Sequence, residues 1–99
     1  MALPGPTNLQ VRRISPTALE ASWEPPPFTG ISGYRVYYSM HYAAEMEKWQ
    51  SIEISSYTVT EISGLEPHTA YAVRVRAKTA DGKYSNFSET AVTNRIESG

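Results

Sequence analysis

The chain has 99 residues, a formal net charge of −1 and no cysteine. Its 40% hydrophobic and 11% aromatic content favours a packed core over disorder, and the length suits one domain. The near-zero charge gives no general attraction to nucleic acid, and the missing thiols exclude disulfides and zinc–thiolate sites. No apolar run approaches the roughly 20 residues that a membrane-spanning helix needs, so we expect no direct membrane insertion.

We therefore expect a single domain over residues 1–99, with a core from about residue 4 to 95. Met1 to Leu3 is too short for a signal peptide. Proline and glycine clusters separate short runs rich in Val, Ile, Thr and Tyr, which is typical of an all-β sandwich or barrel.

The first clear strand is predicted from Ala18 to Glu24. Leu19, Ala21 and Trp23 share one face of it, and polar residues share the other. Trp23 is the largest inward group, and its truncation should cost about 3–5 kcal/mol of stability. We interpret Trp23 as a structural residue.

The next strand is predicted over residues 34–39. Its inward face carries Tyr34, Val36 and Tyr38, and its outward face carries Arg35, Tyr37 and Ser39. Residues 41–48 lack β character and contain helix formers, which predicts an enlarged loop with one helical turn. Met40, Tyr42 and Met46 in or beside this loop are a candidate apolar contact, or they pack back on the sheet edge.

The segment from Tyr57 to Leu65 has a less regular pattern. Val59 and Ile62 are three residues apart, so both cannot point inward in an uninterrupted strand. A bulge or an early end of the strand would reconcile them.

A third clear strand is predicted over residues 71–78. Tyr71, Val73, Val75 and Ala77 alternate with Ala72, Arg74, Arg76 and Lys78. A run of aromatic-Ser-x-aromatic-Ser follows at Tyr84 to Ser88, and its rings could stack on Arg76 or Arg74. The same run contains Asn86-Phe87-Ser88, which fits the N-glycosylation sequon and makes Asn86 a possible glycan site.

Four segments of the sequence together resemble the fibronectin type III family over nearly the whole chain. They are Pro4-Gly5-Pro6, Trp23 to Pro26, Gly33 to Tyr38, and Gly64 to Val75. The resemblance implies a seven-stranded antiparallel immunoglobulin-like sandwich. It also implies that Tyr71 forms the family's tyrosine corner, framed by Leu65 and Pro67. Repeats of receptor tyrosine phosphatases of the leukocyte-antigen-related class and of netrin receptors look most similar.

The residues offer little chemistry for catalysis. Asp81 is the only aspartate and sits in an Asp-Gly turn, while His41 and His68 lie in predicted loops without metal-ligand spacing. No glycine-rich phosphate loop or nucleophile elbow is present. We therefore expect no enzyme activity, no cofactor and no metal.

The resemblance implies a protein-binding or spacer module in the extracellular region of a receptor or adhesion molecule. Its partner would be a receptor, a ligand, a neighbouring domain or a glycosaminoglycan. The candidate contact is a basic and aromatic patch on one sheet face: Arg35, Tyr37, Arg74, Arg76 and Lys78. The alternative is a solvated face whose arginines pair with nearby glutamates.

Three other readings stay open. Similar domains alternate with immunoglobulin domains in intracellular muscle arrays. Tyr84 to Ser88 resembles a degenerate Trp-Ser-x-Trp-Ser motif of class I cytokine receptors, where the domain would bind a ligand. An accessory module of a secreted bacterial hydrolase is the third.

Overall fold

The computed structural model describes residues 3–41 and 43–93. The described part contains seven strands and one 3-10 turn. They are β1 (Thr7–Ser15), β2 (Ala18–Glu24), β3 (Ile31–Ser39), η1 (Met46–Lys48), β4 (Gln50–Ile54), β5 (Val59–Ile62), β6 (Tyr71–Thr79) and β7 (Ala91–Thr93). The expected helical turn is η1. The ends of the expected domain, Met1, Ala2 and the residues around Arg95, lie outside the described residues.

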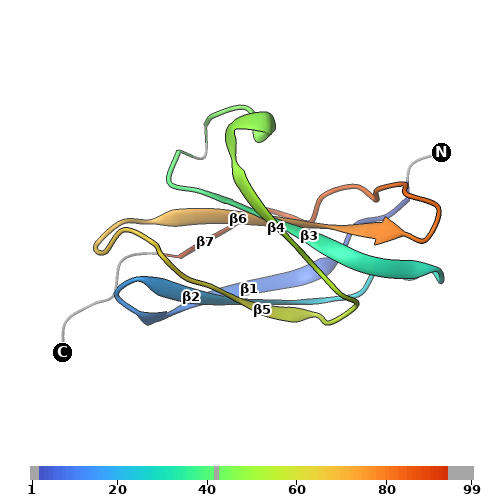
Figure 1. Ribbon diagram of the computed structural model, residues 1–99, viewed down its shortest axis with the longest axis horizontal. Helices are drawn as coiled ribbons and strands as arrows, with labels where there is room; N and C mark the ends of the chain where they lie inside the picture. Colours follow the sequence, from blue (N-terminus) through green and yellow to red (C-terminus); the bar gives the residue numbers. More distant parts are fainter. Residues whose placement is uncertain (1–2, 42, 94–99) are drawn as a thin grey trace.

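The strands form two antiparallel sheets that face each other (Figure 1). The first sheet has the order β1-β2-β5, and the second has the order β4-β3-β6-β7. The prediction of an all-β, seven-stranded antiparallel sandwich is confirmed. Strands with period-2 alternation each bury one face, so the inward residues of both sheets meet in one core.

The core contains the inward residues predicted for the three clear strands. Among its buried members are Leu19, Ala21, Trp23, Tyr34, Val36, Val73, Val75 and Ala77. Trp23 and Tyr34 meet edge to face with ring centroids 5.3 Å apart. Burial raises the pKa of Tyr34 above its ordinary value, and the neighbouring Trp23 indole offsets part of this rise.

Strand β5 differs from the prediction. It pairs with β2 without a register shift, from Ser22 opposite Val59 to Leu19 opposite Ile62. Ile62 is buried at 2% exposure, while Val59 is 48% exposed and points outward. The expected bulge or early strand end is therefore wrong, because an edge strand tolerates a branched apolar side chain on its solvent side.

The tyrosine corner connects β5 to β6. The Glu66 N–H donates a 2.8 Å hydrogen bond to the Tyr71 hydroxyl oxygen, as the family resemblance implied. Leu65 is buried beneath the corner, whereas Pro67 is exposed. The corner is thus tied to the core through Leu65 and Tyr71.

Arg13 adds a second connection that the sequence patterns did not indicate. Its guanidinium lies over the Tyr71 ring, 5.6 Å from the centroid. It also donates to the carbonyl oxygens of Thr69 and Pro16, so it fastens the β1–β2 turn to the corner.

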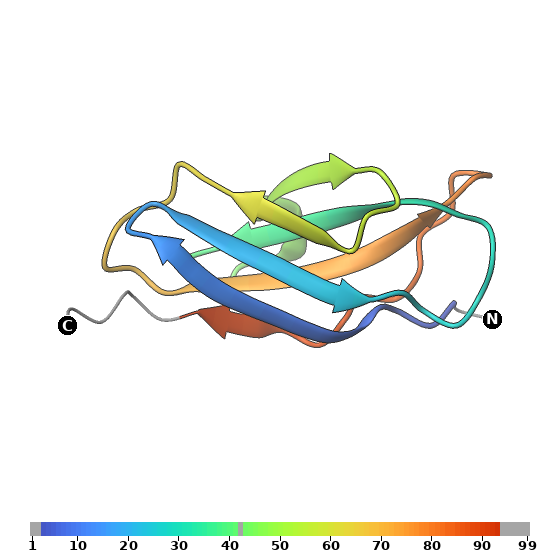
Figure 2. The ribbon, with the colours of Figure 1, turned by 90° about the horizontal axis from the view of Figure 1, so that it is seen from below.

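The body is elongated, with extents of 44 × 25 × 19 Å. The start of β1 and the end of β7 lie at opposite ends of the long axis (Figure 2). The segment before β1 packs against residues 86–87, where the Asn86 N–H donates to the Leu3 carbonyl oxygen at 2.9 Å. Gly5 is required there, because an added Cβ would lie 2.4 Å from the Asn86 carbonyl oxygen.

Candidate recognition face

The outward side of the second sheet collects the five residues predicted as a contact patch. Arg74, Arg76 and Lys78 alternate along β6, and Arg35 and Tyr37 come from β3. In the register, Arg35 is opposite Arg76 and Tyr37 is opposite Arg74. Like charges opposite each other are normally destabilising. The other contacts of Arg35 and Arg76 therefore have to offset the repulsion between these two side chains.

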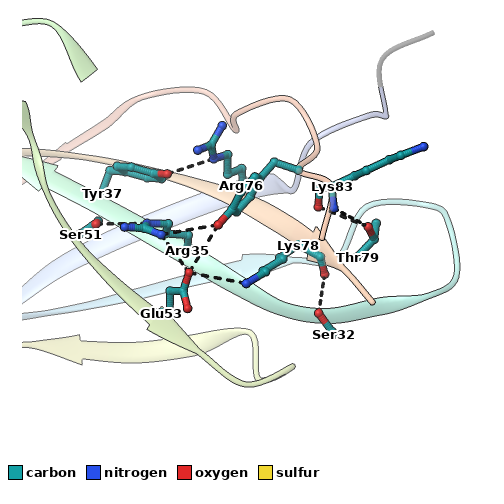
Figure 3. Close-up of polar contacts among 10 residues, drawn as sticks. Ser32, Arg35, Tyr37, Ser51, Glu53, Arg76, Lys78, Thr79 and Lys83 are labelled. Atoms are coloured by element: carbon teal, nitrogen blue, oxygen red, sulfur yellow. Dashed lines mark hydrogen bonds and ion pairs between the residues drawn. The ribbon is translucent and has the colours of Figure 1, made fainter. Parts of the chain in front are cut away.

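Arg76 lies at the centre of an aromatic stack. Its guanidinium carbon is 4.0 Å from the Tyr84 ring centroid, 4.9 Å from that of Phe87 and 5.3 Å from that of Tyr37. Its Nε donates a 3.0 Å hydrogen bond to the Tyr37 hydroxyl oxygen (Figure 3). The hypothesis that Tyr84 or Phe87 stacks on Arg76 is confirmed.

The two serines of the aromatic-Ser-x-aromatic-Ser run hold these rings in place. Ser85 donates its N–H to the Ala77 carbonyl oxygen, and its hydroxyl accepts the Ala77 N–H at 2.8 Å. Ser88 likewise donates its N–H to the Val75 carbonyl oxygen, and its hydroxyl oxygen accepts the Val75 N–H at 3.0 Å. Both serines are buried, so the segment continues the pairing of β6 and turns Tyr84 and Phe87 toward Arg76.

Arg35 and Lys78 share the carboxylate of Glu53, so part of the face follows the alternative in which its cations pair with glutamates, although the sequence patterns did not single out Glu53. The Glu53 Oε1 of β4 accepts a 2.8 Å hydrogen bond from Arg35 Nη1, lies 3.8 Å from Lys78 Nζ, and accepts from the Tyr84 hydroxyl at 3.4 Å (Figure 3). The hydrogen bond between Arg35 and the Tyr84 hydroxyl, helped by the charge of Glu53, raises the pKa of Arg35. Prediction of this ion pair would have required the β3–β4 register, which places Glu53 opposite Arg35.

Tyr37 is outward, as predicted, but it is not an open contact residue. It is only 7% exposed and forms a small second cluster with buried Trp49 and Ala72. Met46 and Phe87 pack against this cluster. The expectation of an accessible Tyr37 needs correction, because the segment after β3 folds back over the face.

The fold-back of that segment depends on Trp49. Its indole Nε1 donates a 3.0 Å hydrogen bond to the Ala44 carbonyl oxygen. Met46 therefore packs on the sheet, while Met40 stays 41% exposed. Tyr42 lies outside the described residues.

Arg74 lies beside this cluster. Its guanidinium carbon is 5.0 Å from the Trp49 ring centroid. Its Nε donates to Thr90 Oγ1 at 2.6 Å, and its Nη1 lies 3.1 Å from Met46 Sδ. Over residues 3–41 and 43–93, neither Arg74 nor Arg76 has a carboxylate within ion-pair distance.

The remaining predicted residues are dispersed. Asn86 is exposed beside the aromatic stack, which leaves its side chain accessible. His41, His68 and Asp81 are each exposed, and the described residues contain no group of three potential metal ligands. Within the same residues, no helix is long and apolar enough to cross a membrane.

Two facing antiparallel sheets with this strand order define an immunoglobulin-like sandwich module. The model of the fibronectin type III domain matches residues 4–94, and the chain belongs to this family. The family has a non-catalytic module fold.

Its relatives include receptor-type phosphatases. The chain is 38% identical over 79 residues to the tyrosine-protein phosphatase Lar of Drosophila melanogaster, and 37% identical over 79 residues to the receptor-type tyrosine-protein phosphatase S of Gallus gallus. It covers 4% and 5% of those two proteins, and the match includes 78% of this chain in each case. The predicted similarity to leukocyte-antigen-related receptor phosphatases is confirmed.

Solved structures show the same fold. The FN1–FN3 domains of chicken CNTN1 align with a TM-score of 0.83 at 24% identity, over 96% of this chain and 32% of that one. The FN5 domain of Drosophila Lar aligns with a TM-score of 0.76 at 23% identity, over 97% of this chain and all of that one.

Proposed function

We propose that residues 1–99 form one non-catalytic protein-binding module in the extracellular region of a cell-surface receptor or adhesion molecule. The observation that carries this proposal is the outward face of the second sheet. There, Arg35, Arg74, Arg76 and Lys78 have only Glu53 within ion-pair distance among the described residues. Tyrosine, tryptophan and arginine, which are enriched at binding hot spots, are concentrated on the same face.

The receptor setting is supported by the relatives. Several of them, such as the receptor-type tyrosine-protein phosphatases S and F, are receptor-type by name, and each is far longer than this chain. The body is elongated, and the chain enters β1 from one side of the long axis and leaves β7 toward the other (Figure 2). This geometry suits a series of domains joined end to end. A module in such a series both spaces its neighbours and exposes a sheet face.

A binding screen tests the proposal. The folded domain would be immobilised and exposed to a panel of receptor ectodomains and to heparin. The test variant combines Arg74→Glu with Lys78→Glu, since neither side chain is the centre of the aromatic stack. The control is Arg12→Glu on the outer side of the first sheet, where Arg12 pairs with Glu20 at 3.1 Å.

We expect a protein partner whose affinity falls by about 10-fold or more in the double variant and stays unchanged in the control. Failure of the folded wild-type domain to bind any ectodomain would leave spacing as its role. Binding to heparin alone, lost in the double variant, would replace the protein partner by a glycosaminoglycan.

The extracellular location is tested through Asn86. Expression through a secretory pathway should attach a glycan that a glycosidase removes and that Asn86→Gln abolishes, because Asn86 is exposed within a sequon. Folding of Asn86→Gln should be normal, since the segment is held by the backbone N–H of this residue. A secreted wild-type domain with an unmodified mass would remove this support.

A further inference from the structure

We infer that Arg74, flanked by Trp49 and Val92, is the anchor of the recognition face and takes a carboxylate that adjoins an apolar side chain of a protein partner. This inference rests on the proposed protein-binding function and specifies its chemistry. It separates Arg74, which is available to a partner, from Arg35, Arg76 and Lys78, whose side chains already make ion pairs, ring stacks or hydrogen bonds within the domain.

The guanidinium of Arg74 is held in place before any partner arrives. Trp49 lies under it, Thr90 accepts its Nε–H, and Met46 accepts from Nη1. These three contacts come from two separate segments, residues 46–49 and Thr90, so the side chain has little rotamer freedom left to lose on binding.

The outer edge of this guanidinium is available. Nη2 of Arg74 has no hydrogen-bond partner among the described residues, and the acceptor of Nη1 is a thioether sulfur, which is a weak one. A carboxylate forms two parallel hydrogen bonds with such an edge and would readily replace the sulfur contact.

The other cations of the face are less available. Arg35 and Lys78 already share the Glu53 carboxylate. Arg76 is covered by three rings and donates its Nε–H inward to Tyr37. An incoming anion would have to compete with these contacts. At Arg74 it would instead accept hydrogen bonds from Nη1 and Nη2, which have a weak acceptor and no acceptor, respectively, among the described residues.

The surroundings of Arg74 select an acid with an apolar neighbour. Val92 of β7 is 54% exposed and lies opposite Ala72 in the register. Ala72 packs with Trp49, over which Arg74 stacks, so Val92 borders the same spot. Diagonal neighbours on a sheet face are about 7–8 Å apart, within reach of one side chain next to the carboxylate.

This arrangement favours a protein segment over a sulfated polysaccharide. Affinity for a polyanion comes from several unneutralised cations that act together along its length. Here Arg74, which has no carboxylate partner among the described residues, stands beside apolar groups. Arg35 and Lys78 share the single carboxylate of Glu53, and Arg76 is covered by three rings, so these cations are not free to act together along a polyanion. Heparin is therefore the competing ligand in the test.

The test is a nuclear magnetic resonance titration of the folded domain. The probe is the blocked peptide acetyl-Leu-Glu-Leu-amide, and its matched control is the same peptide with Gln in place of Glu. The reporters are the Arg74 Nε–H and Trp49 Nε1–H signals. The domain variants are Arg74→Gln and, as the control on the opposite sheet, Arg12→Gln.

We expect saturable shifts at both reporters with a weak Kd of about 1–10 mM, because the short peptide is held by one guanidinium and the apolar groups beside it. Binding should weaken about 10-fold in Arg74→Gln, stay unchanged in Arg12→Gln, and weaken similarly for the Gln peptide. Equal shifts with both peptides, or binding that persists in Arg74→Gln, would overturn the inference.

A titration with a heparin fragment and the ectodomain screen distinguish failure of this inference from failure of the proposed protein-binding function. Tighter binding of a heparin fragment, centred on Arg35 and Lys78, would also overturn it. A protein partner that tolerates Arg74→Gln but not the double variant would preserve the proposed function and refute Arg74 as anchor. A domain that binds the Glu peptide as expected but no ectodomain would refute only the proposed function.

Discussion

Replacement of Arg76 by methionine should destabilise the domain more than the same change at Arg74. Arg76→Met keeps most of the side-chain stem and removes the charge, the planar group and the hydrogen bond to the Tyr37 hydroxyl. Arg74→Met removes a stack on one ring, Trp49, and a hydrogen bond to Thr90. The pair thus compares a guanidinium among three rings with a guanidinium on one.

The expected magnitude follows from the contacts. Partly exposed cation–π contacts contribute about 0.5–1 kcal/mol each, and the hydrogen bond contributes about 1 kcal/mol. Because one guanidinium makes all of them, they are not fully additive, and we expect about 2–3 kcal/mol for Arg76→Met. For Arg74→Met, which loses one stack and one hydrogen bond, we expect about 1–1.5 kcal/mol after the same allowance for non-additivity. In a domain of this size, the first value lowers Tm by about 10–20 °C.

Urea denaturation followed by tryptophan fluorescence measures both changes. The slope of the unfolding free energy with urea should be the same in all variants, so that a lower midpoint reports stability alone. A double-mutant cycle of Arg76→Met with Tyr84→Leu should give a coupling energy of about 1 kcal/mol. A loss below about 0.5 kcal/mol for Arg76→Met, or one no larger than for Arg74→Met, would refute the structural role of the stack.

Three further predictions concern the core and its corner. Tyr71→Phe leaves the Glu66 N–H without its acceptor and should cost about 1–2 kcal/mol in urea denaturation, with an unchanged value arguing against the corner bond. Gly33→Ala places a Cβ 2.4 Å from the Ile54 carbonyl oxygen and should cost about 1–3 kcal/mol, whereas a neutral result would mean that β3 and β4 separate freely. The raised pKa of Tyr34 means that the unfolded chain loses this proton first, so stability should fall as pH rises above about 10. Comparison of stability at pH 8 and above pH 10 checks this, and Tyr34→Phe should reduce the fall; an equal fall in both would contradict it.

The sequence predicted the inward faces of β2, β3 and β6 because their alternation is regular and each strand is central in its sheet. Leu19, Val36 and Val75 are all buried where period 2 places them. The stack of Tyr84 on Arg76 was also predictable, because the aromatic-Ser-x-aromatic-Ser run directly follows the strand that carries the arginine.

The parts that could not be predicted depend on contacts between distant segments. The burial of Tyr37 needs the loop after β3 to fold back, and that loop has no periodicity to indicate its path. Glu53 lies opposite Arg35 only because of the β3–β4 register, which composition does not determine. Val59 was misread because a four-residue edge strand is too short for alternation to show its buried side.

The opposite placement of the two terminal strands has a mechanical consequence. β1 enters at one end of the long axis and β7 leaves at the other, and each belongs to a different sheet (Figure 2). Ladder hydrogen bonds run perpendicular to their strands, so tension between Thr7 and Thr93 would shear the β1–β2 and β6–β7 ladders. In shear, the bonds of a ladder carry the load together instead of opening one after another. The domain would therefore resist stretching along the axis on which neighbouring domains would pull.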